Sequence, residues 1–256
     1  MTPRTIRIGD VEVPRIGMGT NRLTHTASHE RFVRDAAGSG IGMIDTAHLY
    51  AGGESETTIG AALDGGRSPC VIATKGGYTD GRAAVLRLEI ENSLQRLRTG
   101  VIELYYLHRP DREASLEESL GLLNHYREAG TIRHVGISAV TIEQIERAAR
   151  VVPITAVQNQ YNVGERSDDD VVDYCEAHGI VFVPYYPLRA DHHALGRVAR
   201  RHGATPAQIA LSWLLHRSPV VVPIPGTLSL AHAKENVGAL DIDLSDDDLG
   251  ELRKAA

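Results

Sequence analysis

The sequence predicts an α/β protein, a (β/α)8 TIM barrel with an N-terminal β-hairpin that closes one end. The chain has 256 residues, a length at which an α/β barrel is a common single-domain solution. Short β-branched runs alternate with helical patterns along the chain, which is typical of a parallel sheet covered by helices. No G-x-G-x-x-G motif follows an early strand, which disfavours the competing architecture, an open doubly wound sheet. We therefore expect residues 1–256 to form one domain.

The first predicted element is the hairpin. Residues 5–16 alternate between polar and apolar side chains, with Gly9 and Asp10 between the runs TIRI and VEVPRI. A two-residue Gly/Asp turn between alternating runs is typical of a β-hairpin. No helix follows it, so we expect it to cover one end of the core.

Eight runs then fit the strands of a barrel. They are residues 15–18, 41–44, 70–74, 101–107, 134–137, 156–158, 180–184 and 220–223. Helix starts between them carry capping boxes, in which a Ser or Thr accepts from the third helical amide and an acidic or amide side chain bonds back. The expected boxes are Ser115 with Glu118, Thr141 with Gln144, and Thr205 with Gln208, the last followed by Pro206 at the first helical position.

Composition excludes several classes of function. The formal net charge is −6 and the arginines are scattered, so the basic stripe of a nucleic-acid partner is missing. Cys70 and Cys175 are too far apart in the sequence to suggest a disulfide framework or a metal site. The N-terminus lacks a signal-peptide core, and no run approaches the roughly 18 apolar residues of a membrane span. We expect a soluble, cytoplasmic protein without metal.

Two acidic runs, residues 168–170 and 246–248, are expected to be solvated first turns of helices. Negative charge there interacts favourably with the positive end of the helix dipole.

Polar side chains follow three consecutive predicted strands. Asp45 follows residues 41–44, Lys75 follows 70–74 and His108 follows 101–107. Tyr50 lies five positions after Asp45 in the same loop. Because the carboxyl ends of barrel strands meet at one face, we expect these four side chains to converge there.

The four side chains together would form an acid suited to reducing a carbonyl. A tyrosine has a reference pKa of about 10, so a neighbouring cation that favours phenolate helps it to donate a proton. Lys75 could supply that charge and Asp45 could keep it ionised, while His108 could orient a carbonyl oxygen. Lys75 is one of three lysines among 27 basic residues. Its alternative interpretation is an ordinary lysine that extends its charge to solvent.

An ordered series of fragments resembles the aldo-keto reductases over nearly the whole chain. The fragments are IDTAHLY, GESE, ATK, YYLHRPD, GIS, VQNQYN, and PIPGT through KEN. The Gln158 region and the stretch FVPYYPL are most similar to the short bacterial members, among them some pyridoxal reductases. The resemblance implies hydride transfer from NADPH, with NADH as an alternative, to an aldehyde or ketone. It assigns Tyr50 as general acid, tuned by Lys75 and Asp45, with His108 positioning the carbonyl.

The resemblance also implies a set of cofactor contacts along the barrel mouth. Ser138 and Gln158 would bond the nicotinamide carboxamide, and Tyr185 would stack on its ring. The alternative for Tyr185 is a core aromatic on a buried strand. The remaining expected contacts are Gly19, Thr20 and Asn21 in the first loop, Leu188 after the FVPYY stretch, Gly226 and Thr227 at the adenosine phosphate, and Glu235 and Asn236 at the adenine.

Several positions depart from the family pattern. Ala139 replaces the usual asparagine, which removes one carboxamide contact. Gly226 and His232 stand where many members carry lysine and arginine, so a 2′-phosphate loses two charged partners. Lys234 could substitute, and NADPH stays the favoured cofactor. Asn21 replaces a tryptophan that lines the pocket of larger members.

The chain stops at Ala256, after a helix expected to begin at Ser245. We therefore expect no long substrate-covering tail and an open site. A second hypothesis remains, a barrel that binds the cofactor and acts as a redox-sensing or regulatory partner with little turnover. The physiological substrate is left open, and a monomer is the expectation from the family.

Overall fold

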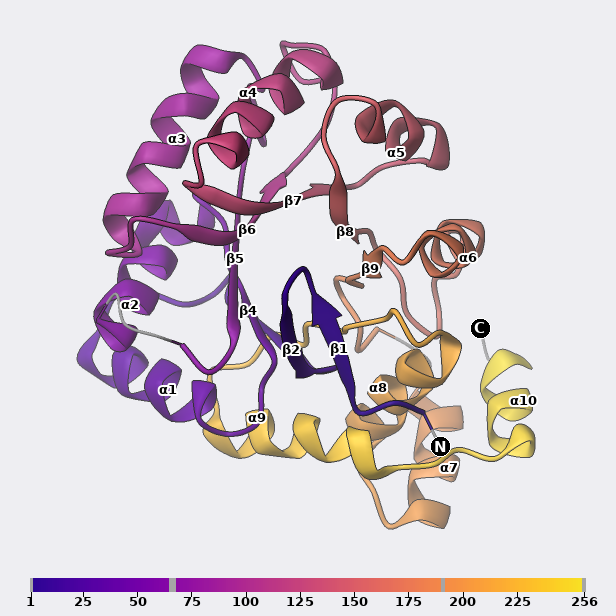
Figure 1. Cartoon of the computed structure of the whole chain (residues 1–256). Coiled ribbons are helices and arrows are strands. Elements are labelled where there is room, and N and C mark those ends of the chain that lie inside the picture. The colour runs from indigo at the N-terminus through magenta and orange to yellow at the C-terminus, as the bar shows by residue number, and fades with distance from the viewer. Residues whose placement is uncertain (1, 65–67, 190–191, 255–256) are drawn as a thin grey trace.

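The computed structural model describes residues 2–64, 68–189 and 192–254. Seven parallel strands form one curled sheet in chain order, with helices outside it (Figure 1). The strands are β3 Gly17–Gly19, β4 Met43–Asp45, β5 Val71–Gly76, β6 Ile102–Leu107, β7 Ile132–Ser138, β8 Ile154–Gln158 and β9 Val181–Phe182. The fold is therefore the predicted (β/α)8 barrel.

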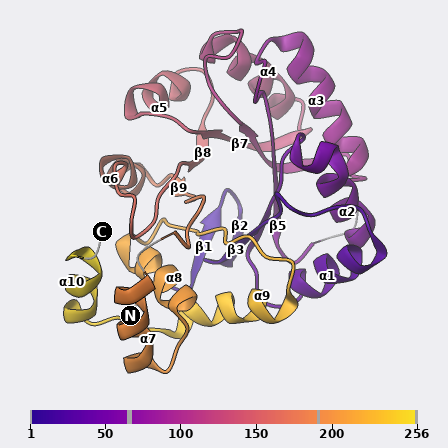
Figure 2. The ribbon, with the colours of Figure 1, turned by 180° about the vertical axis from the view of Figure 1, so that it is seen from behind.

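The segment after residue 218 closes the barrel, although it is not a regular strand. The Phe182 N–H donates to the Val220 carbonyl at 2.9 Å, and the Gly17 N–H donates to the Pro223 carbonyl at 2.9 Å. These bonds link the segment to β9 on one side and to β3 on the other (Figure 2). The strand predicted at 220–223 is reduced to isolated bridges. Pro223 and Pro225 lack the N–H that a continuous ladder needs.

Helices surround the sheet (Figures 1 and 2). They are α1 Ala27–Ala37, α2 Glu54–Leu63, α3 Ala83–Arg96, α4 Leu116–Glu128, α5 Ile142–Ala149, α6 Asp169–His178, α7 His192–His202, α8 Pro206–Arg217, α9 Leu230–Val237 and α10 Asp246–Lys254, with short 3-10 helices η1 Tyr50–Gly53 and η2 Gly238–Asp241. Reciprocal capping boxes begin α5 at Thr141 and α8 at Thr205, as predicted. At α4 only half of the expected box forms. Ser115 accepts from the Glu118 N–H, whereas the Leu116 N–H donates to Asp111.

The N-terminal hairpin covers the end of the barrel at which the strands begin. Strand β1, Thr5–Ile8, pairs antiparallel with β2, Val11–Pro14, and Ile8 and Val13 are buried against interior residues of the barrel. Gly9 turns with φ 62°, and a Cβ there would lie 2.0 Å from His134 Nε2. The hairpin tip therefore packs directly on the start of β7, and only glycine fits.

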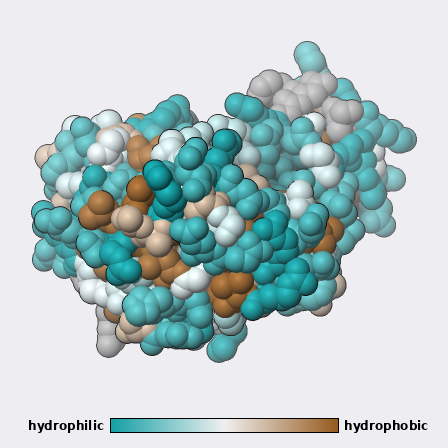
Figure 3. Space-filling model, turned by 90° about the horizontal axis from the view of Figure 1, so that it is seen from above, coloured by the Kyte–Doolittle hydropathy of each residue, from teal (hydrophilic) through white to brown (hydrophobic). Residues whose placement is uncertain are grey.

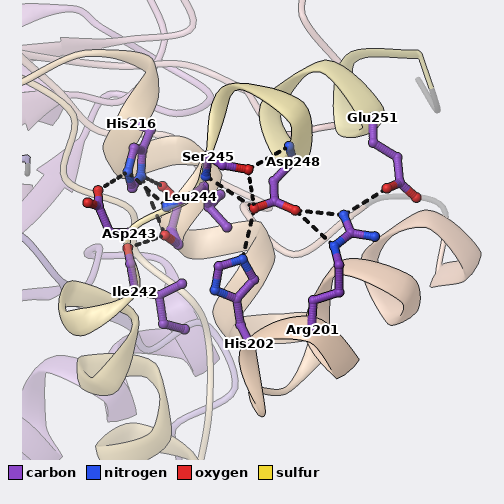
Figure 4. A network of polar contacts seen from close by, with 10 residues as sticks. Arg201, His202, His216, Ile242, Asp243, Leu244, Ser245, Asp248 and Glu251 are labelled. Atoms are coloured by element: carbon purple, nitrogen blue, oxygen red, sulfur yellow. Dashed lines mark hydrogen bonds and ion pairs between the residues drawn. The ribbon is translucent and has the colours of Figure 1, made fainter.

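One acidic run differs from its prediction. Asp169 and Asp170 lie in the first turn of α6, but Asp248 of the second run is buried. Its carboxylate accepts from Arg201 Nη2 at 2.6 Å and from His202 Nε2 at 2.9 Å, both on α7 (Figure 4). The prediction of a solvated turn was wrong here because α10 packs this face on α7.

The surface seen in Figure 3 is mostly hydrophilic, with hydrophobic residues in small groups. None of the helices in the described ranges is both long and apolar enough to span a membrane.

Candidate active site

A cleft of about 660 Å³ opens where the barrel strands end. We call it the mouth cleft. The predicted residues that line it are Gly19, Thr20, Asn21, Asp45, Tyr50, His108, Ser138, Gln158, Tyr185, Leu188 and Gly226. With Tyr78 after β5, the ends of all seven parallel strands contribute to one concave site.

An ion pair forms the floor beneath this cleft. Lys75 Nζ on β5 donates to Asp45 Oδ1 on β4 at 2.5 Å and to the Thr46 carbonyl at 2.7 Å. Both charged side chains are almost completely buried. Burial opposes the charge of the Lys75 ammonium, but Asp45 and Tyr50 outweigh it, so the pKa of Lys75 is raised. Lys75 is therefore a fixed cation and not the exposed lysine of the alternative interpretation.

Tyr50 completes a chain of polar contacts from this ion pair to the cleft. Lys75 Nζ lies 3.4 Å from Tyr50 Oη. Burial raises the pKa of Tyr50, and the Lys75 charge lowers it without cancelling that rise. This effect of burial on Tyr50 is not visible in the sequence. In the structure the phenol stays protonated at neutral pH and the lysine reduces the cost of losing that proton.

His108 faces Tyr50 across the floor of the cleft. Their rings lie 6.0 Å apart at 82°, and the Tyr78 ring packs 4.9 Å from the His108 ring. Burial, followed by the charges of Lys75 and Arg109, lowers the pKa of His108 to about 2. Its Nδ1 is buried and has no partner among the described residues. The imidazole is therefore neutral, with one nitrogen available as a donor and the other as an acceptor.

Arg96 of α3 holds the loop that carries Tyr50. Its Nη1 donates to the His48 carbonyl at 3.0 Å and to the buried Glu56 at 3.3 Å. Gly53 has φ 97°, and a Cβ there would lie 2.2 Å from Arg96 Cζ. The guanidinium thus contacts the loop on both sides of Tyr50.

The residues expected to contact a nicotinamide lie together in the cleft and offer groups that fit a carboxamide and a flat ring. Ser138 ends β7, Gln158 ends β8, and Tyr185 lies half-buried in the cleft wall. Gln158 Nε2 donates to Asp45 Oδ2 at 2.8 Å, which ties this amide to the ion pair and leaves its oxygen as the acceptor for a carboxamide N–H. The partly exposed Tyr185 is a cleft aromatic rather than a core one.

Ala139 has a backbone conformation that is unusual for alanine. Its φ is 57°, in the left-handed region, while its N–H donates to the Gln158 carbonyl at 3.0 Å. Asparagine adopts this region more readily than alanine because its side chain can hydrogen-bond locally. The departure noted in the sequence therefore removes an amide and also leaves backbone strain beside the cleft.

Of the residues expected to contact the adenosine, fewer lie in the cleft. Thr227, Glu235 and Asn236 do not line the mouth cleft, and the Glu235 carboxylate accepts from Thr205 Oγ1 at 2.6 Å. His232 and Lys234 are exposed on α9. The structure thus does not bring these expected adenine contacts into the cleft, and their role stays a prediction.

Sequence reasoning missed several residues of the cleft. They include Arg22, Tyr78, Arg109, Tyr186 and Arg189. Arg109 and Tyr78 follow strand ends directly, so the rule that selected His108 could have found them. Tyr186 and Arg189 lie in an irregular loop, for which the sequence gives no such signal.

A protonated tyrosine beside a buried lysine–aspartate pair and a neutral histidine form a site that can donate a proton to a carbonyl oxygen. The model of the aldo/keto reductase family matches residues 15–192 and 189–256. The chain belongs to this family.

Relatives of known structure or activity support the assignment. The chain is 33% identical to pyridoxine 4-dehydrogenase of Escherichia coli strain K12, over 98% of both proteins. The thermostable aldo-keto reductase Tm1743, solved with the inhibitor epalrestat, superposes with a TM-score of 0.91 at 31% identity, covering 98% of this chain and 99% of that one. An aldo/keto reductase from Klebsiella pneumoniae, solved with NADP and acetate, has a TM-score of 0.89 at 29% identity, covering 98% and 94%.

Proposed function

We propose that this protein reduces aldehydes or ketones to alcohols with NADPH as the hydride donor. The observation that carries the proposal is the contact between the buried Lys75–Asp45 pair and Tyr50 at the floor of the mouth cleft. A buried cation beside a phenol stabilises the phenolate that remains after proton donation.

The residues act at the two ends of the carbonyl bond. A bound reduced nicotinamide would supply the hydride for the carbonyl carbon, and Tyr50 would give its proton to the carbonyl oxygen. Lys75 stabilises the resulting phenolate, while Asp45 keeps the lysine charged and in place. His108 is neutral near neutral pH because its pKa is lowered. Its one N–H donates a hydrogen bond that orients the carbonyl oxygen.

The residues that line the cleft suggest which parts of the cofactor each would contact. Ser138 and Gln158 would bond the carboxamide, Tyr185 would cover the ring, and Gly19, Thr20, Asn21, Leu188 and Gly226 would lie along the remaining length. NADPH is favoured because an aldo/keto reductase similar over 98% of the chain was solved with NADP. The exposed Lys234 is the candidate partner for the 2′-phosphate.

Pyridoxal is the first substrate to try. The proposal rests on the similarity to pyridoxine 4-dehydrogenase. We expect pyridoxal to be reduced faster than benzaldehyde; equal or slower reduction would rule out this substrate preference.

The function is tested with Tyr50→Phe, which keeps the aromatic ring and removes the hydroxyl group that would donate the proton. We expect NADPH to quench the fluorescence of Trp213 equally in the variant and the wild type, while aldehyde-dependent NADPH oxidation is lost. Tyr174→Phe, on α6 outside the cleft, serves as the matched control and should keep full turnover. Continued reduction by Tyr50→Phe would contradict the assignment. NADPH binding without turnover in the wild type would favour the regulatory hypothesis.

A further inference from the structure

The mouth cleft is cationic although the chain as a whole is acidic. Three arginines line it, Arg22, Arg109 and Arg189. The sole carboxylate among its described lining residues is Asp45, which is already paired with Lys75. None of the three arginines has an ion pair with a carboxylate in residues 2–64, 68–189 or 192–254. A concave site with unpaired positive charge concentrates anions.

Arg109 is the arginine on the substrate side. Arg22 follows Asn21 and Arg189 follows Leu188, both expected against the cofactor, whereas Arg109 directly follows His108. Its guanidinium lies over the Tyr78 ring at 4.8 Å, and the same ring packs 4.9 Å from the His108 ring. The cation is therefore one aromatic ring away from the residue that orients the carbonyl.

Stacking fixes this guanidinium without using its hydrogen-bond donors. A guanidinium over an aromatic face still presents its in-plane N–H groups, which match a carboxylate or phosphate. Besides burial, the charge of Arg109 acts on the pKa of both His108 and Tyr185. These two residues follow different strands, and Arg109 itself lines the cleft, so its charge acts on both sides of the cleft.

We propose that Arg109, held on Tyr78, is the subsite for an acidic group of the substrate. The substrate class is then a carbonyl compound that carries a carboxylate or phosphate about one ring length from the carbonyl. This inference rests on the proposed reductase function and narrows its substrate.

The test compares 4-carboxybenzaldehyde with its methyl ester, which has no charge. The ester group withdraws electrons more strongly than the carboxylate and makes the aldehyde more reactive, so a preference for the acid comes from binding and not from reactivity. A charge-assisted hydrogen bond corresponds to a preference of about tenfold to a hundredfold. We expect the wild type to show this preference in kcat/KM at low ionic strength, mostly through KM, and to lose part of it in high salt. Glyceraldehyde 3-phosphate compared with glyceraldehyde tests whether a phosphate replaces the carboxylate.

The variants assign the preference to one side chain. In Arg109→Gln the ratio of the acid's kcat/KM to the ester's should fall to one or below, and in Arg109→Lys it should be intermediate because the planar fork is lost. Arg112→Gln is the matched control, since Arg112 is exposed in the same loop and does not line the cleft. An unchanged ratio in Arg109→Gln, or no acid preference in the wild type, would overturn the proposal.

Binding separates this inference from the reductase function. Calorimetric titration with 4-(hydroxymethyl)benzoate and its methyl ester needs no turnover. Tighter binding of the acid in the wild type, lost in Arg109→Gln, supports the subsite even if no carbonyl is reduced. Equal binding of acid and ester would reject the subsite while leaving the reductase function to the Tyr50→Phe experiment.

Discussion

Two buried carboxylates, Asp45 and Asp248, are both bound by basic side chains, but one belongs to the candidate active site and the other joins two helices. Asp45 is 2% exposed and bound by Lys75, and Asp248 is 5% exposed and bound by Arg201 and His202. Asp45 lies where β4 ends at the barrel mouth, whereas Asp248 lies in the first turn of α10.

The neighbours of each carboxylate explain the difference. Asp248 also accepts from the backbone N–H and the hydroxyl of Ser245 (Figure 4), so its network is closed and joins α10 to α7. The network of Asp45 continues through Lys75 to Tyr50 and into the mouth cleft. Near it lie the left-handed Ala139 and Tyr186 and the His108 Nδ1, which has no partner among the residues that the structure describes. Of these two networks, the one that reaches the cleft therefore has an open hydrogen-bonding group and left-handed residues beside it.

The largest expected effect comes from Lys75→Met, which removes the cation beside Tyr50 and keeps a similar length. We expect kcat to fall roughly 10²–10⁴-fold, the range typical of general acid catalysis, because the phenolate loses its stabilising charge. Steady-state kinetics with one aldehyde measure this. Asp248→Asn is the control, and it should keep the wild-type kcat. Similar kcat losses in both variants would remove the distinction between the two networks.

The converse effect concerns stability. Asp248→Asn should lower the free energy of unfolding by roughly 2 kcal/mol, less than for a fully buried pair because Arg201 is half exposed. For a domain of this size the melting temperature should fall by several degrees. Thermal unfolding followed by circular dichroism measures the change. An unchanged melting temperature would mean that the α7–α10 network adds no stability.

The difference in unfolding free energy between wild type and Asp248→Asn should depend on pH. Burial raises the pKa of Asp248, but hydrogen bonds from His202, Arg201 and Ser245 outweigh it and hold the pKa below its usual value. A carboxyl group with a lowered folded-state pKa stabilises the fold fully above its unfolded pKa of about 4, and this stability is lost as pH falls through the folded pKa. In urea unfolding, the advantage of wild type over Asp248→Asn should stay constant above about pH 5 and shrink below about pH 4. A constant difference at acid pH would contradict the role of the ionised carboxylate.

The two regions also differ in how far the sequence could predict them. Asp45, Lys75 and His108 each lie at the end of a strand, and parallel strands end at one face, so position along the chain predicts that they meet. Three consecutive aspartates in α10 look equally solvated, and only the packing of α10 on α7 decides that Asp248 is buried. The closing segment at 220–223 has strand-like composition, but its prolines break the ladder.

The smallest expected effect is at Ala139, where the strained backbone borders the nicotinamide end. Both Ala139→Gly and Ala139→Asn should relieve the left-handed strain, by about 1 kcal/mol at most. Only asparagine also restores an amide for the carboxamide, so it alone should tighten NADPH binding, by a few fold, as measured by fluorescence titration. The glycine variant separates the two causes. If glycine tightens binding as much as asparagine does, backbone strain and not the missing amide limits cofactor affinity. If neither variant is stabilised in thermal unfolding, the left-handed conformation of Ala139 costs little free energy. Backbone strain would then no longer be a difference between the barrel mouth and the closed network around Asp248.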